Sequence, residues 1–156
     1  MLVSSSVTLL KEEKDFIEAY ALENAKDYQS NGRKYETKVK NIIIGKSGEL
    51  AFSKIYNEKK KENLQVDYSK GADPGYDFKT SKNIKIDVKT LDKNYKQKVY
   101  VNASFLRADI YVLMLFNDVL NEYFYEGFIK HEDVKNNLHY DDVYKAYFID
   151  RCLFKK

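Results

Sequence analysis

The stretch DIYVLMLF at positions 109–116 constrains the fold more than any other part of the chain, because seven apolar residues follow a single aspartate. Strands that are apolar on every residue, and not only on alternate residues, occur where both faces of a sheet are covered. We therefore expect residues 109–116 to form a strand in the middle of a sheet.

Alternating side chains predict a hairpin upstream of this strand. Residues 76–80 and 84–91 read as its two strands, joined by a polar turn. In the second strand, Ile84, Ile86 and Val88 face one way, and the residues between them face the other. Elsewhere, periodicity predicts helices at 11–28, 41–57 and 130–137, and strands at 64–68, 99–103, 122–129 and 146–155.

Length and composition limit the class of protein. The 156 residues fit a single domain, 1–156, which can fold without a disulfide or a structural metal. Cys152 is the only cysteine, which excludes an internal disulfide and suggests a reducing compartment. The first residues lack the pattern of a signal peptide, and no window approaches about eighteen uninterrupted apolar residues. We expect a soluble, cytoplasmic protein with no membrane partner, and the net charge of +3 does not by itself indicate nucleic acid.

The stretch IIIGKSGELAF, 42–52, contains Gly45-Lys46-Ser47 and so looks like the end of a phosphate-binding loop. Such a loop needs another glycine five positions before its second glycine, and position 40 is a lysine. It also needs a buried strand leading into it, whereas a basic segment precedes this stretch. We therefore expect no nucleotide cofactor.

The same stretch fits a helix that begins at Asn41, a candidate cap, and ends near Asn57. Gly45 and Gly48 each cost a helix about 1 kcal/mol relative to alanine. Two glycines on one side of the helix indicate that another element packs closely against that side. Glu49 is expected to point toward that element.

Three more charged side chains are expected to meet beside Glu49. Asp87 and Lys89 share the face of their strand that is opposite to Ile84, Ile86 and Val88. If Tyr76 and Phe78 lie in the same core layer as the isoleucines, Asp77 between them faces Asp87 and Lys89 across the hairpin. Carboxylates with open coordination positions bind Mg²⁺ and leave room for phosphate oxygens, and a nearby ammonium can orient the attacking water. The grouping indicates phosphodiester hydrolysis.

The segments GKSGELAF, DPGYDF and IDVKT together resemble the PD-(D/E)xK superfamily of restriction-endonuclease-like nucleases. The resemblance implies an α/β fold with a mixed central β-sheet flanked by helices, to which the helix at 11–28 is an addition. It implies a helix glutamate at Glu49, a metal-binding aspartate at Asp77, and an acid-x-lysine pair at Asp87 and Lys89. It also implies that the backbone carbonyl of Val88 is a metal ligand. RADIYVLMLF and EYFYEGFIKHEDVK are similar to the segments that follow this pair, so the resemblance covers most of 41–154.

The match departs from the family pattern at one point. Pro74 stands three residues before Asp77, whereas the proline and aspartate of the family are adjacent, so Asp73 is a second candidate, although it fits a turn better. Each site residue also has a purely structural interpretation: Asp77 could close a turn, Asp87 and Lys89 could form an exposed ion pair, and Glu49 could be a solvated helix residue.

Other polar residues are expected to be structural. His131 and His139 have no partner at metal-binding spacing, and Asp141 and Asp142 are expected in a turn. Cys152 is expected to be a small buried side chain of the terminal strand.

These observations predict a small nuclease that hydrolyses DNA with Mg²⁺, or with Mn²⁺ in its place, and that is structure-selective or part of a larger system. Asp77, Asp87, Glu49 and the Val88 carbonyl would hold the ion, and Lys89 would position the water. The lysine-rich segment 82–98 would hold DNA phosphates. Cutting two strands would need two sites and hence a homodimer. The alternatives are a nucleic-acid-binding or inhibitor protein that retains the fold without hydrolysis, and an RNA-processing enzyme.

Overall fold

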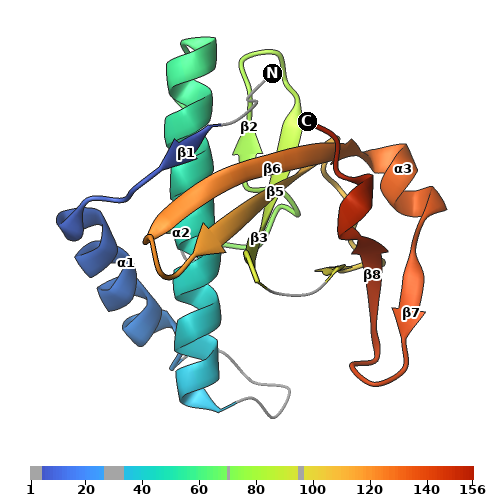
Figure 1. Ribbon diagram of the computed structural model, residues 1–156, viewed down its shortest axis with the longest axis horizontal. Helices are drawn as coiled ribbons and strands as arrows, with labels where there is room; N and C mark the ends of the chain where they lie inside the picture. The colour runs from blue at the N-terminus through green and yellow to red at the C-terminus, as the bar shows by residue number, and fades with distance from the viewer. Residues whose placement is uncertain (1–4, 27–33, 70, 95–96) are drawn as a thin grey trace.

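The computed structural model describes residues 5–26, 34–69, 71–94 and 97–156 (Figure 1). The helices are α1 (Lys11–Asn24), α2 (Tyr35–Lys60) and α3 (His131–Asn136), with a 3₁₀ turn at Arg151–Leu153. The strands are β1 (Ser6–Val7), β2 (Phe78–Lys79), β3 (Lys85–Asp92), β4 (Lys98–Val101), β5 (Ile110–Asn117), β6 (Glu122–Lys130), β7 (His139–Asp141) and β8 (Ala146–Asp150). Among the described residues, no helix has the length and apolar character needed to cross a membrane.

Within these ranges the strands form two sheets. The larger sheet has the order β1-β6-β5-β3-β2, and it is mixed because β3 and β5 are parallel while its other neighbours are antiparallel. The smaller sheet, β4-β8-β7, is antiparallel. β5 lies in the middle of the larger sheet, which confirms the prediction made from its uninterrupted apolar sequence.

The two faces of β5 belong to two hydrophobic cores. Val112 and Met114 point into a helix-side core, and Leu113 and Leu115 point into a small-sheet core. The helix-side core comprises Leu9, Ile17, Ala51, Phe52, Ile55, Leu64, Phe78, Ile86, Val88, Val112, Met114, Tyr123 and Tyr125. The small-sheet core comprises Val99, Val101, Ala108, Tyr111, Leu113, Leu115, Ile129, Val134, Ile149 and Phe154. The fold is therefore α/β: α1 and α2 cover one face of a curled mixed sheet, and the small sheet with α3 covers the other (Figure 1).

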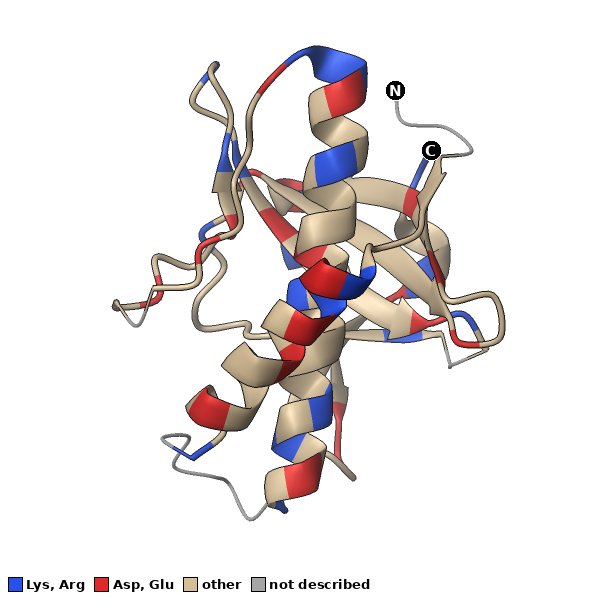
Figure 2. Ribbon diagram, turned by 90° about the vertical axis from the view of Figure 1, so that its left-hand side faces the viewer, with Lys and Arg blue, Asp and Glu red and all other residues tan. Residues whose placement is uncertain are grey.

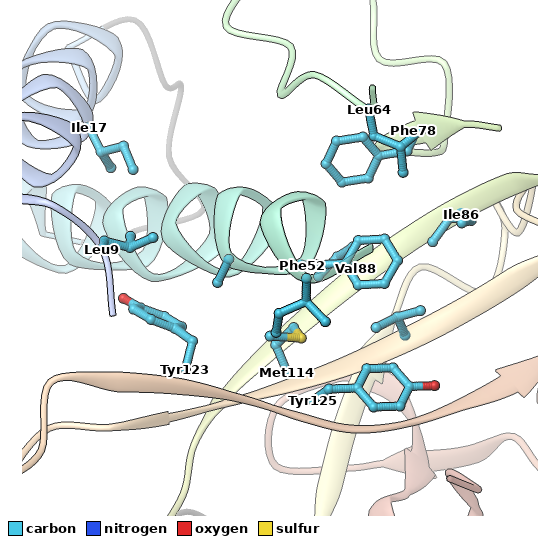
Figure 3. Packing of buried hydrophobic residues seen from close by; sticks show 13 residues of the cluster. Leu9, Ile17, Phe52, Leu64, Phe78, Ile86, Val88, Met114, Tyr123 and Tyr125 are labelled. Atoms are coloured by element: carbon cyan, nitrogen blue, oxygen red, sulfur yellow. The ribbon is translucent and has the colours of Figure 1, made fainter. Parts of the chain in front are cut away.

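Phe52 fixes α2 against the centre of the sheet. Its side chain is 1% exposed and lies beside Val88 of β3 and Met114 of β5 (Figure 3). Burial of one such side chain stabilises the folded state by roughly 1.5–3 kcal/mol. Because α2 also carries Glu49, this contact sets the position of that glutamate above β3.

A β-bulge in β6 lets the strand serve both cores. Leu113 pairs with Gly127 and Met114 pairs with Tyr125, so Glu126 is the extra residue between them. Because side chains alternate with a period of two, one extra residue moves all later side chains to the opposite face. Tyr125 consequently faces the helix-side core and Ile129 the small-sheet core.

Two predicted helix boundaries and one predicted strand are wrong. α2 begins at Tyr35 instead of Asn41, because its first turns are polar and mostly exposed and so show no apolar periodicity. The strand predicted at 64–68 is absent from these described residues. There the side-chain amide of Asn57 accepts a hydrogen bond of 2.7 Å from the backbone N–H of Leu64 and donates one of 2.9 Å to its carbonyl. The side chain thus forms the two hydrogen bonds that a neighbouring strand would have formed. The helix predicted at 11–28 ends at Asn24, and residues 27 and 28 lie outside the described ranges.

The C-terminal prediction is only partly confirmed. β8 ends at Asp150, whose side chain accepts a hydrogen bond of 2.9 Å from the backbone of Cys152 and so starts the 3₁₀ turn. Cys152 is exposed in this turn, so the prediction of a buried thiol is wrong. The short strands β1 and β7 were not predicted, because two or three residues carry too little periodicity to be recognised.

Candidate functional site

Asp77 lies where β2 and β3 begin to separate. Its backbone N–H donates to the carbonyl of Ile86 at 2.9 Å, and its Oδ2 accepts a hydrogen bond of 2.7 Å from the backbone N–H of Val88. The carboxylate thus satisfies an amide that a longer β2 would have bonded. Through this hydrogen bond, the backbone of Val88 holds the Asp77 side chain over the middle of β3.

Of the two aromatic neighbours of Asp77, only one packs in the same core layer as Ile86 of β3. Phe78 packs in the helix-side core, but Tyr76 packs against the small-sheet core. β2 begins only at Phe78, so strand alternation does not extend to Tyr76. Asp77 still reaches β3 because its own backbone pairs with Ile86.

Asp87 and Lys89 share one face of β3, as the alternation predicted. Their side chains form an ion pair of 2.8 Å between Oδ2 and Nζ and are 15% and 31% exposed. Asp87 Oδ2 is buried, and among the described residues the ammonium of Lys89 is the group that contacts it.

Gly48 brings α2 close to β3. A Cβ added at Gly48 would overlap the hydroxyl of Thr90 on β3, whereas one added at Gly45 would meet no atom of the described residues within 4 Å. The predicted close packing is therefore confirmed at Gly48 and wrong at Gly45. Glu49, the next residue, is 8% exposed and faces the same region.

Lys46 is a member of the site that was not predicted. Its Nζ donates to Glu49 Oε2 at 2.8 Å and to the backbone carbonyl of Asp67 at 3.0 Å. In the sequence, Lys46 stands out only as the lysine of an incomplete phosphate-binding loop. Its spacing of three residues from Glu49 on one helix could have identified the pair.

The side chains of the site influence one another electrostatically. Burial, followed by the nearby Glu49 and Asp87 carboxylates, raises the pKa of Asp77 to about 8. Burial also raises the pKa of Glu49, although Lys46 opposes that effect. For Lys89, burial lowers the pKa, but the Asp87 carboxylate outweighs it and the net pKa is raised. Glu49, Asp77, Asp87 and Lys89 therefore lie close enough for their charges to shift one another's pKa.

The residues present fit one hydrated divalent ion better than an ion enclosed by protein ligands. Within the described part of the chain, no group of three or more His, Cys, Asp or Glu side chains is close enough to hold a metal ion. Mg²⁺ commonly uses only one or two carboxylates and keeps several waters. Asp77 and Asp87 can supply these: Asp87 Oδ2 is a buried oxygen contacted by the ammonium of Lys89, and burial, with the Glu49 and Asp87 carboxylates nearby, raises the pKa of Asp77, so that a bound cation would stabilise its ionised form. Glu49 Oε2 is already engaged by Lys46.

No protein-family model and no curated protein matches this chain. The function is therefore inferred from the chemistry of the site formed by Glu49, Asp77, Asp87, Lys89 and Lys46.

The lysine-rich segment 82–98 does not form one continuous basic surface. Lys98 pairs with Asp141 at 2.9 Å, and the ammonium groups of Lys85 and Lys93 lie 5.5 Å from the rings of Tyr76 and Phe124. Lys96 lies outside the described residues. Figure 2 shows acidic and basic positions interspersed over α2 and the neighbouring strands.

Two other acidic residues have structural roles. Asp73 accepts a hydrogen bond of 2.7 Å from the backbone of Gly75, which confirms the predicted turn role. Asp141 ends β7 and is 6% exposed, and it binds Lys98 as well as the hydroxyl of Tyr100 at 2.7 Å. The hydrogen bonds from Lys98 and Tyr100 hold the pKa of Asp141 far below its usual value. Asp141 thus joins β7 to β4 within the small sheet.

Proposed function

We propose that the chain is a Mg²⁺-dependent deoxyribonuclease that hydrolyses phosphodiester bonds, with Mn²⁺ able to replace Mg²⁺. The observation that supports this most is the grouping of Asp77 and Asp87 with Lys89 at the junction of β2 and β3. We also propose that the larger sheet and α2 form a restriction endonuclease-like PD-(D/E)xK core, with α1 as an addition, acting in the cytoplasm.

In this proposal each residue has a distinct role. Asp77 and Asp87 hold the divalent ion, which when bound supplies Lewis acidity toward the phosphate and lowers the pKa of its water. The carbonyl of Val88 is a further ligand by resemblance to the family. Lys89, held in place by Asp87, orients the attacking water and offsets negative charge at the phosphate. Glu49 completes the network around the ion and water.

A second candidate is a nucleic-acid-binding or inhibitor protein that retains the fold without hydrolysing anything. Two observations favour it: the described chain lacks a group of three metal-ligating side chains, and Asp87 and Glu49 each have a lysine partner already. Because Lys89 neutralises Asp87 and Lys46 neutralises Glu49, these two carboxylates need no metal ion to be stable. Cleavage of two DNA strands, if found, would further require a homodimer or two successive events.

A cleavage assay separates these candidates. The purified protein is incubated with linear, nicked and branched DNA, and with RNA, in Mg²⁺, Mn²⁺ or EDTA. We expect DNA cleavage only with a divalent ion, and a loss of at least about 100-fold in rate for Asp87→Ala and Lys89→Ala. Lys59→Ala, at an exposed position on the same helix as Glu49, is the matched control and should cleave normally.

Three outcomes would change the conclusion. Metal-dependent cleavage that survives Asp87→Ala or Lys89→Ala would remove the site assignment. Binding of nucleic acid without cleavage in every condition would favour the second candidate. Preference for RNA over DNA would indicate an RNA-processing enzyme.

A further inference from the structure

The site contains a second lysine whose position the proposed reaction does not use. Lys46 lies one turn before Glu49 on α2, and its Nζ is 2.8 Å from Glu49 Oε2 and 3.0 Å from the carbonyl oxygen of Asp67. The ion pair is largely enclosed, with side chains that are 20% and 11% exposed. A buried pair of this kind is stable only when additional hydrogen bonds satisfy its donors and acceptors, and here the Asp67 carbonyl provides one.

The surroundings hold Lys46 in this position. The ring of Tyr68 lies 6.0 Å from its Nζ, and the same ring packs edge-on against Phe16 and Tyr20 of α1. The segment that carries Asp67 and Tyr68 thus contacts Lys46, and α1 packs against the same segment. An ammonium enclosed in this way is a fixed part of the site, unlike a solvated lysine at its edge.

The charges of the site suggest what this fixed ammonium does. Glu49, Asp77 and Asp87 bring three carboxylates, and Lys46 and Lys89 bring two ammonium groups, which leaves one negative charge uncompensated when all are ionised. One divalent ion would more than offset that charge and leave the site attractive to a phosphate. A second ion bound to Glu49 would lie close to Lys46, whose charge would repel it.

We propose that Lys46 is a built-in cation that takes the place of a second metal ion, so that the site binds a single divalent ion. Lys46 acts as a positioning residue: it occupies Glu49 Oε2 and keeps that carboxylate from becoming a ligand of a second ion. This inference rests on the proposed function, because it concerns the ion that Asp77 and Asp87 are proposed to hold.

The test is the stoichiometry of Mn²⁺ binding to the metal-free full chain, measured by calorimetry and by the loss of the free-ion signal in electron paramagnetic resonance. We expect one ion per chain for the wild type and for Lys46→Arg, which keeps the charge. We expect two ions per chain for Lys46→Met, which keeps the length of the side chain and removes its charge. In the double variant Lys46→Met with Glu49→Gln, the second ion should be lost again.

The matched control is Lys54→Met, on the same helix, because Lys54 pairs with Glu13 of α1 and not with the site. It should bind one ion. Circular dichroism establishes that each variant is folded, and Lys46→Gln replaces Lys46→Met if the latter is not. If neither variant folds, the number of ions bound by the wild type is the test: one ion per chain supports the inference, and two ions per chain overturn it.

The results also separate this inference from the proposed function. Two ions per wild-type chain, or one ion in a folded Lys46→Met or Lys46→Gln, together with metal-dependent cleavage, would overturn the role of Lys46 and leave the nuclease proposal intact. An absence of binding to the wild type, or binding unchanged by Asp77→Asn, would overturn both.

Discussion

Asp77 combines a structural and a chemical role in one side chain. It satisfies the amide of Val88, and it is also the carboxylate whose pKa is raised to about 8 by burial and by the neighbouring Glu49 and Asp87. The folded chain therefore holds a proton at Asp77 that the unfolded chain releases near its ordinary pKa of 3.8. A carboxyl group of this kind stabilises the fold below its unfolded pKa, and the contribution is lost as the pH rises through the folded pKa.

Asp77→Asn should remove this pH dependence. Asparagine keeps an oxygen that can accept the Val88 bond and carries no charge at any pH. At about pH 5 the variant and the wild type should have similar free energies of unfolding, and above that pH the variant should gain an advantage of up to about 1.4 kcal/mol for each pH unit until the folded pKa of Asp77 is passed. Urea unfolding in EDTA across this range measures the difference. An equal difference at every pH would show that Asp77 does not titrate as proposed.

A divalent ion should also stabilise the wild type at a pH where Asp77 is ionised. If Mg²⁺ binds the ionised Asp77 of the folded chain, it should raise the midpoint of thermal unfolding at about pH 8, by an amount that grows with ion concentration. Asp77→Asn should lose this response. A midpoint that rises equally in both proteins would indicate binding elsewhere.

At the scale of the element, α2 depends on one glycine and tolerates loss of the other. Gly48 allows the helix to approach Thr90, whereas the space around Gly45 is open among the described residues. The two positions lie one turn apart, so the helix itself imposes nearly the same propensity cost at both.

The pair Gly48→Ala and Gly45→Ala should therefore have opposite effects. Gly45→Ala should stabilise the protein by up to about 1 kcal/mol, through helix propensity. Gly48→Ala should destabilise it by about 2 kcal/mol or more, because its Cβ displaces Thr90 or shifts the helix. Urea unfolding in EDTA measures both changes. Similar effects of the two substitutions would contradict the close approach of α2 and β3.

Some elements and site residues could be predicted from the sequence, and others could not. The strands predicted at 109–116 and 84–91 are observed at Ile110–Asn117 and Lys85–Asp92, each shifted by one residue, because their patterns arise from local alternation and burial. Asp87 and Lys89 followed from the same alternation. The start of α2 at Tyr35 and the non-strand segment at 64–68 could not be predicted, because the first is polar and the second depends on one side chain, Asn57. The Lys46–Glu49 pair could have been recognised from its helical spacing, whereas the hydrogen bond from Lys46 to the carbonyl of Asp67 depends on the fold.

At the scale of the whole molecule, β5 joins two cores that would otherwise be separate. Its side chains alternate between the helix-side core and the small-sheet core, so neither face can lose its packing without exposing the strand. Both cores are therefore expected to unfold together as one cooperative unit.

Two conservative substitutions test this cooperativity. Phe52→Leu in the helix-side core and Ile149→Val in the small-sheet core should each lower the free energy of unfolding by about 1 kcal/mol. In both variants, far-ultraviolet circular dichroism and tyrosine fluorescence should report one coincident transition. An early transition confined to Ile149→Val would instead identify the small sheet as a separately unfolding unit.

The turn at Arg151–Leu153 has a practical consequence. Cys152 is exposed there, and hydrogen bonding with Asp150 raises the pKa of its thiol. Since the thiolate is the reactive form and no other cysteine is present, thiol alkylation should be slow in neutral buffer, faster at higher pH, and confined among thiols to Cys152. A single fluorophore or nitroxide can thus be attached to the native sequence at one known point on its surface.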